Sequence, residues 1–205
     1  GIGVLGQASV MIQEMFKGSV TSAAAAGFVG LLSLFNMAGR FFWSSCSDFI
    51  GRKHTYMIFF ALGAVLYAVV PSLGVAGNKF GFVLLYALIM SMYGGGFATI
   101  PAYLADIFGT RYVGGIHGRL LTAWATAGVL GPVLVNYLRE YQIQQGVAKA
   151  DAYTMVLYIM AGILVLGFIF NTLVKPVHER HHLKHDEFDE LDGIYPAGNS
   201  GERQS

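Results

Sequence analysis

The chain has 205 residues, of which 55% are hydrophobic and only 12% are charged, and its formal net charge is +1. Average soluble domains carry roughly 25% charged residues, so this chain has too little polar surface to cover a soluble globule. The chain has no basic face that could follow a phosphate backbone, so a nucleic-acid partner is excluded. The single cysteine, Cys46, excludes an intramolecular disulfide. The composition predicts an integral membrane protein with lipid around it.

Long apolar runs alternate with short polar connections along the chain. A helix needs about 20 apolar residues to cross the hydrocarbon core. Five runs reach that length, at residues 21–44, 55–75, 80–105, 113–138 and 152–174. Residues 1–16 resemble the end of a further span, so we expect a fragment whose N-terminal part is absent. The sequence predicts an all-α transmembrane domain over residues 1–177 and a polar, disordered tail over 178–205.

The distribution of Lys and Arg predicts the orientation of these helices. One side carries the larger number of basic residues, namely Arg52, Lys53, Arg111, Arg119, Lys175, Arg180 and Lys184. The other side carries Lys17, Lys79, Arg139 and Lys149. We therefore expect the first side and the C-terminus to be cytoplasmic.

Small residues predict where the helices approach one another, because lipid gives no hydrophobic drive between them. The glycines that supply such faces are Gly27, Gly30, Gly94–Gly96, Gly114, Gly115, Gly118, Gly128 and Gly131. Gly131 is followed by Pro132, and we expect this pair to interrupt a helix inside the membrane, as in the moving parts of transporters.

Arg40 is the residue that most strongly suggests a binding site within the membrane. A charge at that depth costs several kcal/mol, about 3 or more, and such residues usually face a cavity or a partner. Its planar guanidinium suits a carboxylate, which accepts two parallel hydrogen bonds. Asn36 lies one turn earlier on the same face. The alternative is an Arg that extends to the membrane boundary or pairs with an acid elsewhere.

Two loops on the predicted cytoplasmic side share a layout of a carboxylate, a glycine and a base. They consist of Asp48, Gly51, Arg52 and Lys53 in the first loop and Asp106 and Arg111 in the second. Gly51 allows a tight turn, and Asp48 can accept from the N–H groups of a neighbouring helix. We expect Arg52 and Lys53 to pair with Asp106. The alternative is a solvated loop that only obeys the charge rule.

Histidines offer two weaker hypotheses. His117 suits either proton coupling or hydrogen-bonded packing, and the sequence favours packing. The tail histidines His178, His181, His182 and His185 are followed by acidic residues, but nothing rigid supports a metal site there. We expect neither a metal nor a cofactor.

The motif Ser44-x-x-x-Asp48-Phe-Ile-Gly51-Arg52-Lys53 resembles the loop signature of the major facilitator superfamily, G-x-x-x-D-[RK]-x-G-[RK]-[RK]. Segments around Gly1–Ser9, Met11–Phe16, Pro101–Thr110 and Ile116–Ala123 are similar to the oxalate:formate antiporter family of that superfamily. The resemblance covers about residues 1–177. It implies helices seven to twelve of a twelve-helix transporter, a six-helix bundle of two three-helix inverted repeats.

The resemblance also implies the site residues and the partner. Arg40 matches the family's substrate-binding Arg on helix eight, and Tyr93 and Phe97 fall where helix ten places aromatic residues around the substrate. Two six-helix halves rock around a central site in this family, so the expected partner is the missing N-terminal half. The chain departs from the loop signature at Ser44 and Phe49.

The most informative departure lies on helix eleven. An oxalate exchanger of this family carries Lys at the position of Trp124, where it completes a cationic clamp for a dicarboxylate. Trp cannot supply that charge, and a dianion held by one Arg would leave a carboxylate unpaired, which is costly. We therefore expect a monocarboxylate such as formate, pyruvate or lactate.

The sequence predicts a secondary transporter of small organic anions in a bacterial-type inner membrane, not an enzyme. An oxalate:formate or other dicarboxylate exchanger is the alternative. A membrane-embedded enzyme would need paired catalytic groups within the helices, and a receptor or scaffold is the remaining class.

Overall fold

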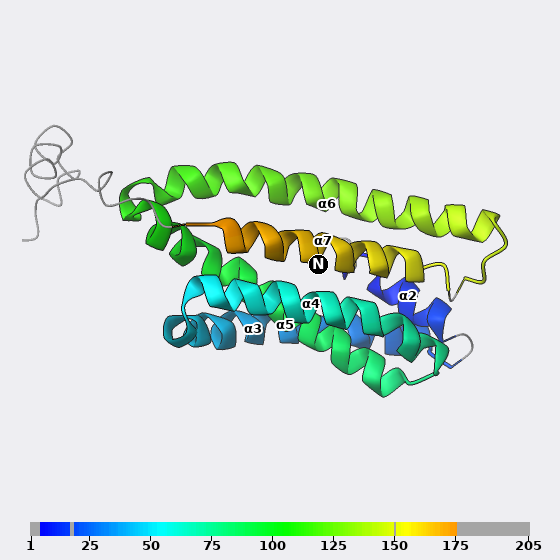
Figure 1. The fold of residues 1–205 in the computed structure, drawn as a ribbon. Coiled ribbons are helices and arrows are strands. Elements are labelled where there is room, and N and C mark those ends of the chain that lie inside the picture. Colours follow the sequence, from blue (N-terminus) through cyan, green and yellow to red (C-terminus); the bar gives the residue numbers. More distant parts are fainter. Residues whose placement is uncertain (1–4, 17–18, 150, 176–205) are drawn as a thin grey trace, which may run out of the picture. The chain divides into compact units, whose positions relative to one another are not determined.

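The structure is a computed structural model that describes residues 5–16, 19–149 and 151–175. The described part is helical and contains no strand. Its elements, in chain order, are α2 (Ala8–Met15), α3 (Ser22–Ile50), α4 (Arg52–Val75), α5 (Lys79–Phe108), the 3-10 turn η1 (Thr110–Tyr112), α6 (Val113–Gln144) and α7 (Thr154–Leu173). Figure 1 shows α3 to α7 joined by short connections.

The long helices confirm the predicted membrane fold. Five helices are long and apolar enough to cross a membrane, and each contains one of the five predicted runs or most of it. The chain is thus an integral, multi-pass membrane protein. The helices extend several residues beyond four of the predicted bounds, because polar residues such as Arg52 and Arg139 continue the helix past the hydrocarbon core.

Local chemistry fixes where the helices begin and end. The Thr21 hydroxyl accepts from the backbone N–H of Ala24 at 3.2 Å, and Asn78 Oδ1 accepts from that of Gly81 at 2.9 Å. Both side chains satisfy N–H groups that lack a partner within the helix. Gly51 has a φ of +90° between α3 and α4, which confirms the predicted tight turn, and Gly109 ends α5 with a φ of +76°. A positive φ strongly favours glycine.

The closest packing joins α3 and α5, at glycines on both helices. A Cβ on Gly39 would overlap the backbone of Ser91, and a Cβ on Gly94 would overlap the carbonyl of Asn36. A Cβ on Gly95 would likewise overlap the Trp43 side chain. The predicted role of Gly94 and Gly95 in close helix contact is confirmed, and Gly39 adds a contact that the sequence analysis missed.

Other predicted glycine contacts are absent from the described residues. A Cβ added at Gly27, Gly30, Gly114, Gly115 or Gly118 would meet no atom of a neighbouring helix within 4 Å. The predicted interruption at Gly131-Pro132 is wrong, because α6 continues through Pro132. A proline removes one backbone hydrogen bond, and a transmembrane helix tolerates that loss where its other hydrogen bonds persist.

The core lies among α2, α3, α4, α5 and the start of α7, and it is rich in aromatic side chains. Phe82 packs edge-on against Phe16 with ring centroids 5.2 Å apart, and Tyr86 lies edge-on against Phe28 at 6.1 Å. By contrast, Val135 is the one buried residue of α6. Most of α6 is therefore exposed to whatever surrounds this chain.

The chain divides into two units after Val174. The helices described above belong to the first unit, and the predicted disordered tail with its histidines falls on residues outside the described ones. Within the described residues, no group of His, Cys, Asp or Glu side chains is arranged to hold a metal ion.

Candidate functional site

The predicted binding residues lie at two levels of the helix bundle. The turns between α3 and α4 and between α5 and α6 lie at the same end, because successive helices are antiparallel. Arg40, Phe97 and Trp124 are each about ten residues from that end of their helices, which places them about 15 Å along the axis. Asn36 and Tyr93 lie one turn deeper, at about 21 Å. The hydrocarbon core is about 30 Å thick, so both levels fall within it.

Arg40 is exposed on α3 and makes no ion pair with any described residue. Its guanidinium carbon lies 5.5 Å from the centroid of the Phe97 ring, in a cation–π contact. Such a contact contributes roughly 0.5–2 kcal/mol and does not neutralise the charge. Arg40 thus presents an uncompensated cation beside an aromatic ring.

Phe97 also contacts Trp124, so it joins Arg40 on α3 to the Trp on α6. The ring centroids of Phe97 and Trp124 are 5.8 Å apart. Trp124 Nε1 donates a hydrogen bond to the Tyr93 hydroxyl oxygen at 3.1 Å. Because the indole N–H is a donor only, Tyr93 accepts in this pair and its own O–H proton is left for another acceptor.

The structure thus brings four of the five predicted binding residues into one series of contacts, from Arg40 through Phe97 and Trp124 to Tyr93. Asn36 is the fifth. Its backbone carbonyl packs against Gly94, and its side chain makes no hydrogen bond with a described residue. The series combines one full charge with neutral hydrogen-bond donors.

A cavity of about 360 Å³ borders this aromatic group. Residues of α4, α5 and α6 line it, with Leu164 of α7. Tyr93, Phe97 and Trp124 form part of its wall, whereas Arg40 and Asn36 do not line it. The described lining of the cavity therefore contains the aromatic members of the series but not its cation.

The first loop is held by Arg52, which pairs mainly within its own turn. Arg52 forms an ion pair with Asp48, four residues before it, and donates to the Ser47 hydroxyl. Its Nε lies 3.9 Å from Asp106 Oδ2, at the outer limit of an ion pair, so the predicted link to Asp106 is present but long. Asp48 accepts from this side chain, not from a neighbouring helix N-terminus as predicted.

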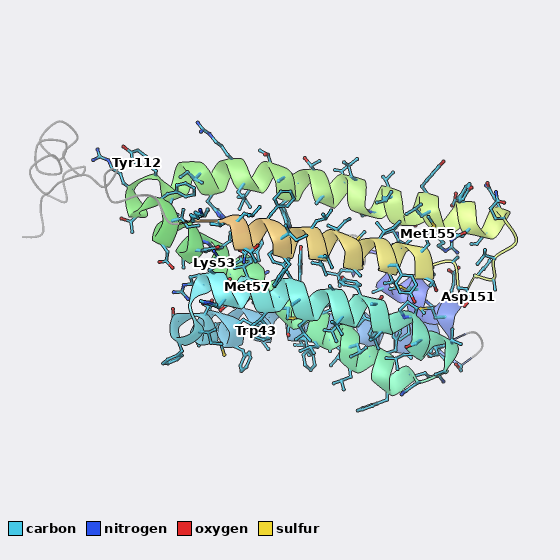
Figure 2. All side chains as sticks on the ribbon, viewed as in Figure 1. Trp43, Lys53, Met57, Tyr112, Asp151 and Met155 are labelled. Carbon is cyan, nitrogen blue, oxygen red and sulfur yellow. The ribbon has the colours of Figure 1, made fainter. Side chains whose placement is uncertain are left out.

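Lys53 does not pair with Asp106, and that prediction is wrong. Its Nζ donates to the backbone carbonyls of Thr172 at 3.0 Å and Val174 at 2.6 Å. These carbonyls lie at the C-terminal end of α7, where a cation satisfies unpaired acceptors and the helix dipole. Asn171 supports the contact by donating to the carbonyl of Lys53 at 3.2 Å. Figure 2 labels Lys53 beside this end of α7.

Arg111 and His117 also differ from expectation. The Arg111 guanidinium lies 6.0 Å from the ring centroid of Tyr112, and it makes no ion pair with a described residue. His117 Nδ1 is buried without a hydrogen-bond partner among the described residues, so it is not the satisfied packing histidine that the sequence favoured.

At the opposite end of the bundle, the structure shows a network that the sequence analysis missed. Arg139 of α6 forms a two-point ion pair with Glu14 of α2, with Arg139 Nε donating to Glu14 Oε2 at 2.8 Å. The Tyr153 hydroxyl donates to the same oxygen at 2.8 Å. Burial raises the pKa of Tyr153, and the bond to Glu14 raises it further, so the hydroxyl keeps its proton. The available sequence signal for this network was that Glu14 and Arg139 lie near helix ends on the same predicted side of the membrane.

Comparison with known proteins identifies the family of the chain. The family model described as Major Facilitator Superfamily matches residues 2–198. The chain is 36% identical over 103 residues to the "Oxalate:formate antiporter" of Oxalobacter formigenes, a match that covers 50% of this chain and 24% of that protein. The match thus spans about a quarter of the relative's length. No solved structure matches the chain. The chain therefore belongs to the Major Facilitator Superfamily.

Proposed function

We propose that the chain is the C-terminal half of a secondary transporter that carries small monocarboxylates, such as pyruvate, lactate or formate, by alternating access. The observation that carries this proposal is Arg40, an exposed cation within the membrane span that makes no ion pair with a described residue. A charge at this depth of a membrane is costly unless it has a partner or faces water. A substrate carboxylate would supply the partner.

The neutral groups beside Arg40 support a substrate with one negative charge. By the resemblance described above, Trp124 stands where a second cation would complete a dicarboxylate clamp, and its N–H already donates to Tyr93. The remaining Tyr93 proton suits a neutral acceptor, such as the carbonyl oxygen of a 2-oxo acid or the hydroxyl oxygen of a 2-hydroxy acid. In this proposal Arg40 binds the carboxylate and Tyr93 binds the second oxygen.

The loop residues have a separate role in the proposal. The Arg52–Asp48 pair and the longer Arg52–Asp106 contact lie at the end where two hairpins meet. Ion pairs at such an end would open and close as the halves rock. We place this end and the C-terminus in the cytoplasm of a bacterial-type cell, and the N-terminal half of the same transporter is the partner.

A dicarboxylate exchanger is the second candidate, and the similarity to the oxalate:formate antiporter favours it. For this chain it requires that another part of the protein supply the second cation. A receptor or scaffold of the same fold would move neither class of anion.

The test uses the full-length protein in proteoliposomes and measures counterflow of labelled oxalate, formate, pyruvate and lactate. The proposal expects pyruvate or lactate exchange without oxalate exchange. Arg40→Gln should lower the apparent affinity about ten- to a hundredfold, because hydrogen bonds to charged groups contribute roughly 1.5–3 kcal/mol. Lys149→Gln, in the connection at the other end, is the matched control. Exchange of oxalate by the unaltered protein would select the second candidate, and no exchange of any anion would reject both.

A further inference from the structure

The cavity bounded by α4, α5 and α6 contains two polar atoms without partners. The Tyr67 hydroxyl and His117 Nδ1 are both buried, and neither has a hydrogen-bond partner among the described residues. Both residues line the cavity, and the Tyr67 side chain is 96% buried within the described structure, since its exposure is 4%. An unsatisfied buried polar group costs roughly 1–3 kcal/mol, so each atom calls for a partner inside the cavity.

One water does not meet both needs. A buried water requires two to four polar partners, and among the other polar groups of the described lining only the Tyr93 O–H is left free to donate. The Tyr56 hydroxyl donates to the Gly96 carbonyl, and Trp124 Nε1 donates to Tyr93. A water at His117 would find a single partner among apolar walls, and no single water can contact both Tyr67 and His117, which are about 16 Å apart along the bundle axis.

The substrate proposed above does not meet the need either. No Lys or Arg lines the cavity, and an ionised carboxylate buried without a cation is strongly disfavoured. The volume of about 360 Å³ is more than twice that of an engineered apolar cavity of roughly 150 Å³ that admits benzene. The occupant must be uncharged, mostly apolar and larger than a small organic acid.

The positions of the two unpaired atoms define the length of the occupant. His117 lies about 6 Å from the helix end and Tyr67 about 22 Å from it, measured along α6 and α4 at 1.5 Å per residue. The two residues are therefore about 16 Å apart along the bundle axis. A volume of about 360 Å³ spread over that length has the narrow cross-section of a single hydrocarbon chain.

We propose that this cavity binds an uncharged chain amphiphile, an alkyl chain with a neutral hydrogen-bonding group such as a hydroxyl at each end. One end pairs with the Tyr67 hydroxyl and the other with His117 Nδ1. The alkyl chain of this ligand packs against Phe60, Leu120 and Ala123 and fills the space between α6 and α4. Val135 is the one buried residue of α6, so an alkyl chain bound in this cavity supplies packing that α6 lacks within the described structure. The site does not depend on which anion is carried.

The experiment uses the full-length protein in lipid nanodiscs and a dodecanol that carries a photoactivatable diazirine in mid-chain. Mass spectrometry of the labelled protein should place the label on α4 and α6, at cavity residues such as Phe60 and Leu120. Unlabelled competitors should rank as dodecane-1,12-diol, then dodecan-1-ol, then dodecane. Each hydroxyl should improve competition about two- to tenfold, as expected for one neutral hydrogen bond.

Matched variants separate the cavity from the lipid-facing surface. Ala123→Phe fills the cavity and should reduce labelling at least tenfold, whereas Val129→Phe, at an exposed position of the same helix, should not change it. Tyr67→Phe should remove the advantage of the diol over the alcohol, and it keeps the test valid if Ala123→Phe fails to fold. Equal competition by the three compounds, or labelling that persists in folded Ala123→Phe, would overturn the proposal.

Discussion

Glu14 and Arg139 lie 125 residues apart in the sequence, yet they form a two-point ion pair in which Arg139 Nε donates to Glu14 Oε2 at 2.8 Å. Each side chain is 17% exposed. The Tyr153 hydroxyl completes the carboxylate's partners, and the Arg139 guanidinium lies 5.7 Å from the Tyr153 ring centroid. The pair therefore ties α2, α6 and the start of α7 together.

Removing either charge of this pair should destabilise the transporter. We expect Glu14→Gln or Arg139→Gln to lower the free energy of unfolding by about 1–3 kcal/mol, somewhat below the cost of breaking a fully buried pair. The thermal midpoint of the full-length protein in detergent measures the effect. The charge-swapped double variant Glu14→Arg/Arg139→Glu is the control, and it should recover at least half of the loss. A double variant as unstable as the sum of the single variants would contradict a direct pair.

Placing a cation on α6 should change the selectivity of the proposed site. In Trp124→Lys, the ammonium would lie opposite Arg40 across Phe97, so we expect oxalate counterflow to appear and pyruvate counterflow to fall. Trp124→Phe is the control, because it keeps a ring against Phe97 but removes the N–H donated to Tyr93. We expect it to weaken pyruvate about two- to tenfold without a gain of oxalate. An oxalate gain in both variants would show that charge is not the determinant.

The contact between α3 and α5 should tolerate no added methyl group. Gly39→Ala would force the new Cβ into the Ser91 backbone, and overpacking of this kind costs roughly 1–3 kcal/mol. Gly30→Ala on the same helix meets no atom within 4 Å and should be neutral or stabilising, because Ala is the better helix former. Thermal midpoints of the two variants test this, and equal midpoints would mean that the helices separate without cost.

Lys53 should stabilise the end of α7 and have little effect on ion pairing in its own loop. Lys53→Met removes the donor to the carbonyls of Thr172 and Val174. We expect amide hydrogen exchange over the last turn of α7 to rise several-fold, since roughly 0.5–1.5 kcal/mol of capping is lost. Arg111→Met, which removes a cation without an ion pair among the described residues, should leave that exchange unchanged. Faster exchange in both variants would point to a general charge effect.

The sequence predicted the helices well because membrane spans are determined by hydropathy over about 20 residues, which is a local property. The sequence-based prediction failed at Pro132, because the continuity of helix α6 depends on the hydrogen bonds that the rest of the helix retains. Among the site residues, the common level of Arg40, Phe97 and Trp124 follows from counting residues from the turns. The hydrogen bond from Trp124 to Tyr93 does not, because it depends on side-chain orientations across two helices.

Among the charged residues, too, the sequence predicts local contacts better than contacts between distant elements. The pair of Arg52 with Asp48 is local, at four residues' separation. The contacts of Lys53 with α7 and of Arg139 with α2 join segments more than 100 residues apart. Which distant element accepts a given base depends on how α7 and α2 pack, and one sequence carries no direct signal for that.

The tight backbone contact between α3 and α5 has a consequence for how selectivity can change. Arg40, Tyr93 and Phe97 stand on two helices that have almost no freedom to shift relative to each other, whereas Trp124 stands on a helix with a single buried residue. In the proposed site, the residue that binds the carboxylate and the Trp that shapes the site thus stand on different parts of the protein. Substitutions on α6 can redirect the transporter to another acid without disturbing the scaffold that holds the cation, so altered specificity should be sought there first.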